Sequence, residues 1–227
     1  MPNSLCLVDL STAFYLEGTS LCNSPQLFSL ETESLLSLSL MQEARFCPGV
    51  AFLSPHLYVF AGATDACERL SLITRQWSAI AAFPYAVTGM STCTRLDNIY
   101  LAANYRYSLQ VFYTLENRFE TLKMSQPFTG RLLWAGQKEL VIIGSEKVCK
   151  AQIKGQHVLI VQKSSKMFSL FVSWTHSSLP PGKVRSLGPT ECNEKAYLLL
   201  QEKHSALTML VTFDKDQTAI SCKPILR

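Results

Sequence analysis

Residues that could carry out chemistry are few in this 227-residue chain, and they lie far apart in the sequence. The histidines, which can act as general bases or metal ligands, are His56, His157, His176 and His204. The eight cysteines are scattered singly, without a Cys-x-x-Cys pair. The chain has no Gly-rich phosphate loop, Gly-x-Ser-x-Gly elbow or His-Glu-x-x-His motif. We therefore predict no catalytic, cofactor or metal site, and we expect each histidine in a turn or at a strand end.

An enzyme remains the alternative if folding gathers distant side chains. Acidic residues such as Asp65, Glu68 and Asp97 could then meet one of the histidines. Convergent polar side chains that include a residue of perturbed pKa would favour this alternative. The elements that position the loops must therefore be identified first.

A strand-like pattern returns about every 42 residues. Apolar runs occur at residues 14–18, 57–62, 99–103 and 140–144, and a fifth fits at 197–201 after a longer interval. Leu35, Trp77 and Phe119 keep the same step. Each unit divides into four short strands, and no segment shows convincing helical periodicity. Because one such sheet cannot bury both faces alone, we predict an all-β propeller in which these three residues belong to the core between blades.

The second and third units resemble Kelch repeats in their apolar strand, its small residues and two aromatic positions. The residues that carry this resemblance are Tyr58, Ala61, Gly62 and Trp77, then Tyr100, Ala102, Ala103, Tyr113 and Phe119. The resemblance implies a Kelch-like propeller that acts in protein interaction, such as substrate capture for a ubiquitin ligase or cytoskeletal scaffolding. Some Kelch-like propellers are copper oxidases, but no pattern here matches their Tyr, His and Cys ligands. A WD-type propeller ranks lower, because its Trp-Asp and Gly-His pairs are missing.

We predict one β-propeller domain over residues 1–227, with about five four-stranded blades. The units cover about residues 5–45, 46–87, 88–130, 131–182 and 183–227. In the fourth, residues 148–153 and 157–162 could be the last two strands, but we favour 158–161 and 167–174, which explains the longer interval. Kelch-like rings more often have six blades, as the resemblance implies. Between a compact five-bladed ring and an incomplete or distorted arc we favour the arc, whose open blade edge could support self-association.

The candidate partner-binding residues are those that this architecture brings to one face, on connections between the second and third strands and between blades. They are Arg45, Asp65, Glu68, Tyr85, Tyr105, Arg106, Tyr107, Arg131, Lys203 and His204. The run from Tyr105 to Tyr107 is the sharpest signal, because Tyr and Arg dominate interface hot spots. The alternative is a structural role, in which the ring of a Tyr covers the blade core while its hydroxyl stays in contact with water. We expect a non-enzymatic protein-interaction module; the alternative is an enzyme whose site lies around the axis.

Charge and composition exclude other classes of partner. Residues 1–122 carry a net charge of about −4 and residues 123–227 about +8, which sum to the +4 of the chain. The lysines are dispersed over predicted turns and strand edges, so we expect neither nucleic-acid nor membrane binding. No apolar stretch approaches the roughly 20 residues of a membrane helix. A secretory signal would begin with basic residues, but no Lys or Arg precedes Arg45. We expect a cytoplasmic protein with reduced thiols rather than disulfides.

Overall fold

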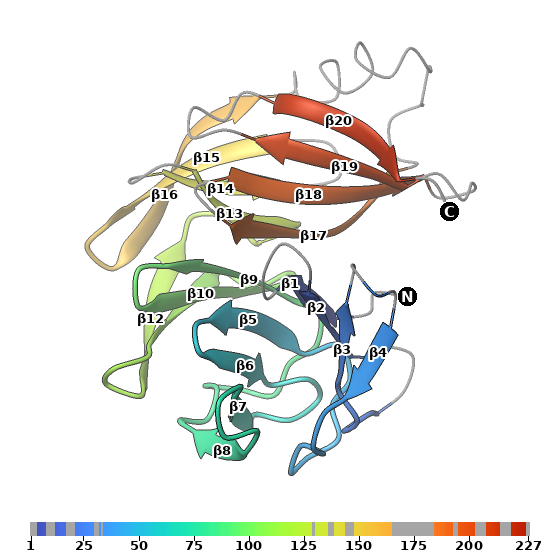
Figure 1. The fold of residues 1–227 in the computed structure, drawn as a ribbon. Helices are drawn as coiled ribbons and strands as arrows, with labels where there is room; N and C mark the ends of the chain where they lie inside the picture. The colour runs from blue at the N-terminus through green and yellow to red at the C-terminus, as the bar shows by residue number, and fades with distance from the viewer. Residues whose placement is uncertain are drawn as a thin grey trace.

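The computed structural model describes residues 4–7, 12–16, 21–29, 32, 34–128, 130–135, 139–143, 148–164, 184–192, 195–202, 208–213 and 219–225. Within these ranges the chain forms strands, turns and bends and contains no helix (Figure 1). The all-β class predicted from the sequence is therefore confirmed.

The strands follow one another in groups of four, each group an antiparallel meander. In chain order they are β1 (Ser4–Leu7), β2 (Thr12–Leu16), β3 (Gln26–Ser29) and β4 (Ser34–Ser37); β5 (Gly49–Leu53), β6 (His56–Phe60), β7 (Cys67–Ser71) and β8 (Trp77–Ile80); β9 (Met90–Arg95), β10 (Asn98–Ala103), β11 (Ser108–Tyr113) and β12 (Arg118–Met124); β13 (Arg131–Ala135), β14 (Glu139–Ile143), β15 (Val148–Lys154) and β16 (His157–Ser164); β17 (Val184–Cys192), β18 (Lys195–Glu202), β19 (Thr208–Phe213) and β20 (Ala219–Ile225).

The second strands β6 and β10 are buried on both faces, which explains their near-continuous apolar sequences. Along β6, Leu57 and Val59 pack into a cluster shared with the first meander. The alternate residues Tyr58 and Phe60 point the other way and contact Phe112 of β11, with ring centroids 6.0 and 5.5 Å apart. Because successive side chains of a strand face opposite sides, one strand contributes to two cores.

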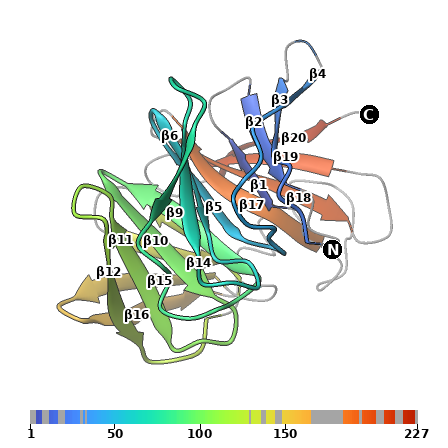
Figure 2. The ribbon, with the colours of Figure 1, turned by 90° about the horizontal axis from the view of Figure 1, so that it is seen from below.

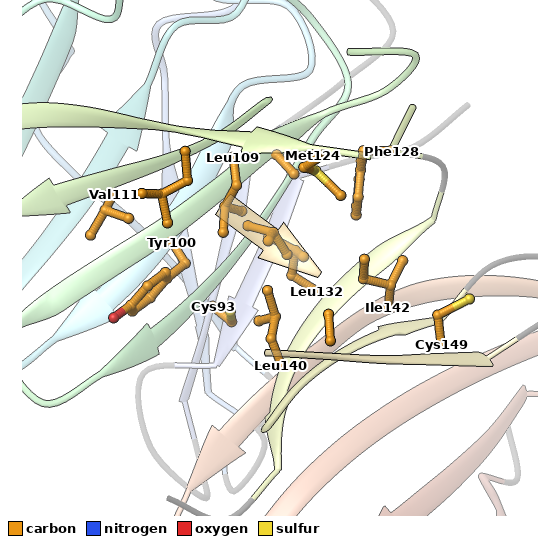
Figure 3. Close-up of a cluster of buried hydrophobic side chains, with 14 residues drawn as sticks. Cys93, Tyr100, Leu109, Val111, Met124, Phe128, Leu132, Leu140, Ile142 and Cys149 are labelled. Carbon is orange, nitrogen blue, oxygen red and sulfur yellow. The ribbon is translucent and has the colours of Figure 1, made fainter. Parts of the chain in front are cut away.

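A further cluster lies between the third and fourth meanders (Figure 3). Leu109 of β11, Leu132 of β13 and Leu140 of β14 are fully buried in it, and Phe128 from the connection between β12 and β13 joins them. Each of the three described clusters thus lies between one meander and the next.

At three junctions in the described part of the chain, the outer strand of one meander, or the residues just after it, is hydrogen-bonded to the last turn or last strand of the following meander. Three such hydrogen bonds run from Trp77 Nε1 to Ser39 O (2.8 Å), from Ala81 N to Asn117 Oδ1 (2.9 Å) and from Lys123 N to Gln156 O (2.8 Å). At the third junction the contact extends into a short parallel pairing of β12 with β16. This pairing joins two meanders into the eight-stranded sheet β13-β14-β15-β16-β12-β11-β10-β9.

The first strands of the meanders contact one another in order, from β1 to β5, β9, β13 and β17, and β17 contacts β1. Figure 2 shows β1, β5, β9 and β17 gathered toward the middle of the molecule. Side-chain hydrogen bonds link these strands: Thr92 Oγ1 donates to Val50 O, and Leu132 N donates to Ser91 Oγ over 2.8 Å. The approach is close at Gly49, where a Cβ would lie 2.9 Å from Met90 Cε.

Two expectations from the sequence need correction. The last strands of the fourth meander are β15 and β16, joined at Gly155 with φ of 57°, and not residues 158–161 with 167–174. Residues 167–174 lie outside the described residues. Leu35 is 58% exposed on β4 and is no core residue, whereas Trp77 and Phe119 are partly buried against the clusters between meanders.

Candidate partner-binding surface

The connection between β10 and β11 displays two tyrosines on a firmly held backbone. Tyr105 is 79% exposed and Tyr107 is 61% exposed. Tyr105 N donates to Phe128 O over 2.7 Å, and Phe128 N donates to Arg106 O over 2.8 Å. Met124 N donates to Tyr107 O over 2.9 Å. The end of β12 and the connection that follows it therefore fix this loop, and the side chains do not need to pack to hold it.

The backbone of Tyr105 lies in the left-handed region, with φ of 63°. Gly and Asn occupy this region readily, whereas other residues lose roughly 1 kcal/mol there. Burial does not compensate for this strain, because the tyrosine ring stands in solvent. Local conflicts of this kind, in which neither backbone preference nor packing explains a residue, concentrate at functional sites.

Arg106 is held over the ring of Tyr85, which reaches it from the connection between β8 and β9. The guanidinium carbon lies 5.0 Å from the ring centroid, a distance typical of a cation–π contact. The Tyr85 ring packs edge-on against buried Phe83, with centroids 5.0 Å apart, and its hydroxyl lies 3.3 Å from Ser108 Oγ. The Tyr85 ring thus orients the Arg106 side chain, which stays exposed to solvent.

Four of the predicted residues, Tyr85, Tyr105, Arg106 and Tyr107, therefore come together and are called the Tyr–Arg surface below. Asp65 is exposed nearby, since its carbonyl accepts a 2.7 Å hydrogen bond from the backbone of Phe83. The contacts by which Phe83 holds Tyr85 and Asp65, and by which Phe128 holds the backbone of Tyr105 and Arg106, were not predicted. The sequence indicated only that the connections containing Phe83 and Phe128 lie on the same face as Tyr105.

Arg45 and Glu68 are buried, which corrects their predicted place on the surface. Their side chains are 0% and 2% exposed and form an ion pair with Nη2 and Oε1 2.5 Å apart. Arg45 Nη1 also donates to Ala61 O over 2.8 Å, and Glu68 Oε2 accepts from Gln42 N over 2.9 Å. The pair joins the connection after β4 to the start of β7, so neither residue can contact a partner.

Arg131 begins β13 and is partly buried. Burial lowers the pKa of its guanidinium, and the nearby Cys47 thiol opposes this shift. Burial also raises the pKa of Cys47. Lys203 and His204, the last two predicted residues, lie outside the described residues.

The described residues contain no group of three or more His, Cys, Asp or Glu side chains that could hold a metal ion. His56 is partly buried, and burial, followed by the charge of Arg69, lowers its pKa. Burial raises the pKa of Cys67 to about 11. The side chains described for Cys22, Cys47, Cys67, Cys93 and Cys149 take part in no disulfide.

No helix in the described part of the chain has the length and apolar character needed to cross a membrane. No protein-family model matches the sequence, and the comparison with curated proteins gives no match either. A function must therefore be inferred from the geometry of the exposed surfaces.

Proposed function

We propose that this protein is a five-bladed, Kelch-like β-propeller that acts as a non-enzymatic protein-interaction module and binds its partner through the Tyr–Arg surface. Each meander would be one blade. The clusters between successive meanders and the contacts among their first strands support this arrangement. The contact of β1 with β17 favours a closed ring over the arc expected from the sequence.

The exposure of Tyr105 on a left-handed backbone carries the functional proposal. Tyrosine and arginine are enriched among the residues that dominate binding energies, because they combine large contact areas with hydrogen-bonding groups. The hydrogen bonds to Phe128 and Met124 order the loop before a partner arrives. Pre-ordering strengthens binding, since less conformational entropy is lost on association.

We propose a protein as the partner and the cytoplasm as the setting, where thiols such as those described would stay reduced. The exposed guanidinium of Arg106, whose sequence neighbours are the exposed Tyr105 and Tyr107, suits carboxylate or carbonyl oxygens beside apolar side chains. A substrate adaptor for a ubiquitin ligase and a cytoskeletal scaffold would both use such a surface. The identity of the captured partner distinguishes these two roles.

The test compares partner capture by the parent protein with capture by a Tyr105→Asn/Tyr107→Ser variant. Asn accepts the φ of residue 105, so the variant should melt no lower than the parent. Proteins captured from lysate by the parent are identified, and the affinity of the purified partner is then measured by calorimetry. We expect the dissociation constant to rise at least about 30-fold, as for the loss of an interface hot spot.

Leu36→Ser is the matched control, because Leu36 is 50% exposed on β4, away from the Tyr–Arg surface. This variant should bind like the parent. If the folded Tyr105→Asn/Tyr107→Ser variant retains the parent's partners at the parent's affinity, the Tyr–Arg surface is not the binding site.

A further inference from the structure

Arg131 is a partly buried cation for which the fold supplies no partner among the described residues. Within them its guanidinium donates no hydrogen bond, and the ion pairs are those of Arg45 with Glu68 and of Arg118 with Glu116. Burial lowers the pKa of Arg131, and no described carboxylate opposes this shift. Burial without a partner is unfavourable for a cation, because it removes part of the hydration of the charge.

The buried Arg45 shows how this fold satisfies an arginine that has a structural role. Its guanidinium forms an ion pair with Glu68 and donates to the carbonyls of Ala61 and Ala66. Arg131 has no contact of this kind with a described residue, although it is only partly exposed. A local conflict of this kind, in which the fold does not explain a residue, is expected at functional sites.

Arg131 lies where the first strands of three meanders begin. It is the first residue of β13, and the next residue, Leu132, donates from its backbone N to Ser91 Oγ of β9 over 2.8 Å. Just before β9, Gly89 N donates to Cys47 O over 2.9 Å, and Cys47 lies two residues before β5. The starts of β5, β9 and β13 therefore meet beside Arg131.

This position adjoins the Tyr–Arg surface. A Cβ at Gly89 would lie 3.5 Å from Asn104 Nδ2, and Asn104 directly precedes Tyr105. On the other side, Phe128 O accepts the 2.7 Å hydrogen bond from Tyr105 N and lies three residues before Arg131. Three residues of extended chain span at most about 11 Å. One bound segment can therefore contact both Arg131 and the exposed tyrosines.

We propose that Arg131 binds an aspartate or glutamate side chain of the partner, which therefore presents an acidic segment to the Tyr–Arg surface. This inference rests on the proposed function. A carboxylate accepts two parallel hydrogen bonds from a guanidinium and compensates its charge. Phosphate groups are bound by clusters of arginines, whereas no second described cation acts on Arg131. Partial exposure keeps the guanidinium accessible to such a side chain.

Selection from a library of random peptides displayed on phage tests the proposal with the full chain as the immobilised protein. We expect the parent to enrich peptides that share one aspartate or glutamate beside apolar residues. An enriched peptide is then synthesised with this acid and with the corresponding amide. The amide should raise the dissociation constant for the parent at least about tenfold, as expected when one member of a charge pair is removed.

The Arg131→Gln variant should bind both peptides within about threefold of each other, because the group that distinguishes them is missing. It should melt no lower than the parent, since it removes an unpaired charge, whereas loss of a structural contact would lower the melting temperature. Arg131→Lys keeps the charge but lacks the planar fork, so it should retain a weaker preference for the acid. Arg75→Gln is the matched control, because Arg75 is exposed between β7 and β8, and it should bind like the parent.

The proposal is overturned if the parent enriches no acidic peptide or if Arg131→Gln keeps the full preference for the acid. A phosphoserine at the acidic position that binds more than about tenfold more tightly would also overturn it, since the site would then suit phosphate. Enriched peptides that lack an acid and are lost with Tyr105→Asn/Tyr107→Ser would overturn this inference alone. Acidic peptides that depend on Arg131 but not on these tyrosines would instead overturn the proposed role of the Tyr–Arg surface.

Discussion

The ion pair between Arg45 and Glu68 should be among the most sensitive points of the fold. A glutamine at position 68 keeps the size and hydrogen-bonding shape of the side chain but removes its charge. The guanidinium of Arg45, which is 0% exposed, would then be a buried cation without a counter-charge. Breaking a buried pair in this way costs about 3–5 kcal/mol, a large part of the stability of an ordinary domain.

The double variant Arg45→Met/Glu68→Gln distinguishes the effect of charge compensation from the effect of the hydrogen bonds that Arg45 makes to the backbone. It carries no buried charge, but it removes the Arg45 donor from the carbonyls of Ala61 and Ala66, of which Ala66 O keeps its hydrogen bond from Ala61 N. The unsatisfied carbonyl of Ala61 costs roughly 1–3 kcal/mol. The double variant should therefore lose at least about 2 kcal/mol less than the sum of Arg45→Met and Glu68→Gln.

Urea unfolding at neutral pH, followed by tryptophan fluorescence, measures the free energy of unfolding of the parent and the three variants. If a single variant is too unstable to purify, recovery of the double variant as a folded protein gives the same answer qualitatively. Additive losses, or a Glu68→Gln variant within 1 kcal/mol of the parent, would show that charge compensation at this pair is unimportant.

Two further predictions concern other parts of the core. Trp77→Phe should lower the free energy of unfolding by about 1 kcal/mol, because the ring packing is largely kept while the hydrogen bond to Ser39 O is lost; a thermal melt identical to that of the parent would contradict this. The pKa of Cys67 is raised from 9.0 to about 11, so its neutral thiol contributes stability that is present below pH 9 and is lost as the pH rises toward 11. Between pH 8 and 10.5 the parent should lose about 2 kcal/mol more than Cys67→Ala; equal losses in the two unfolding series would exclude a role for this thiol.

The repeat could be predicted from the sequence because burial on both faces of β6 and β10 requires apolar residues without interruption. The outer strand of the fourth meander could not be predicted as well. Along β16, Val158 is buried while Leu159 and Val161 are 39% and 49% exposed. An outer strand of a meander that is buried on one side only mixes apolar and polar residues, so its sequence gives a weaker signal than that of an inner strand. The assignment of 158–161 and 167–174 was favoured over 157–162 because it explained the longer interval before residue 197.

The residue types of the Tyr–Arg surface could be predicted, but burial within the connections could not. Asp65 is exposed in the connection before β7, whereas Glu68, which was expected in the same connection, is the second residue of β7 and is buried. Connections have no periodicity that fixes which side chain turns inward. Arg45 is buried because carbonyls in the adjoining connection need donors, and this need is apparent only from the folded backbone.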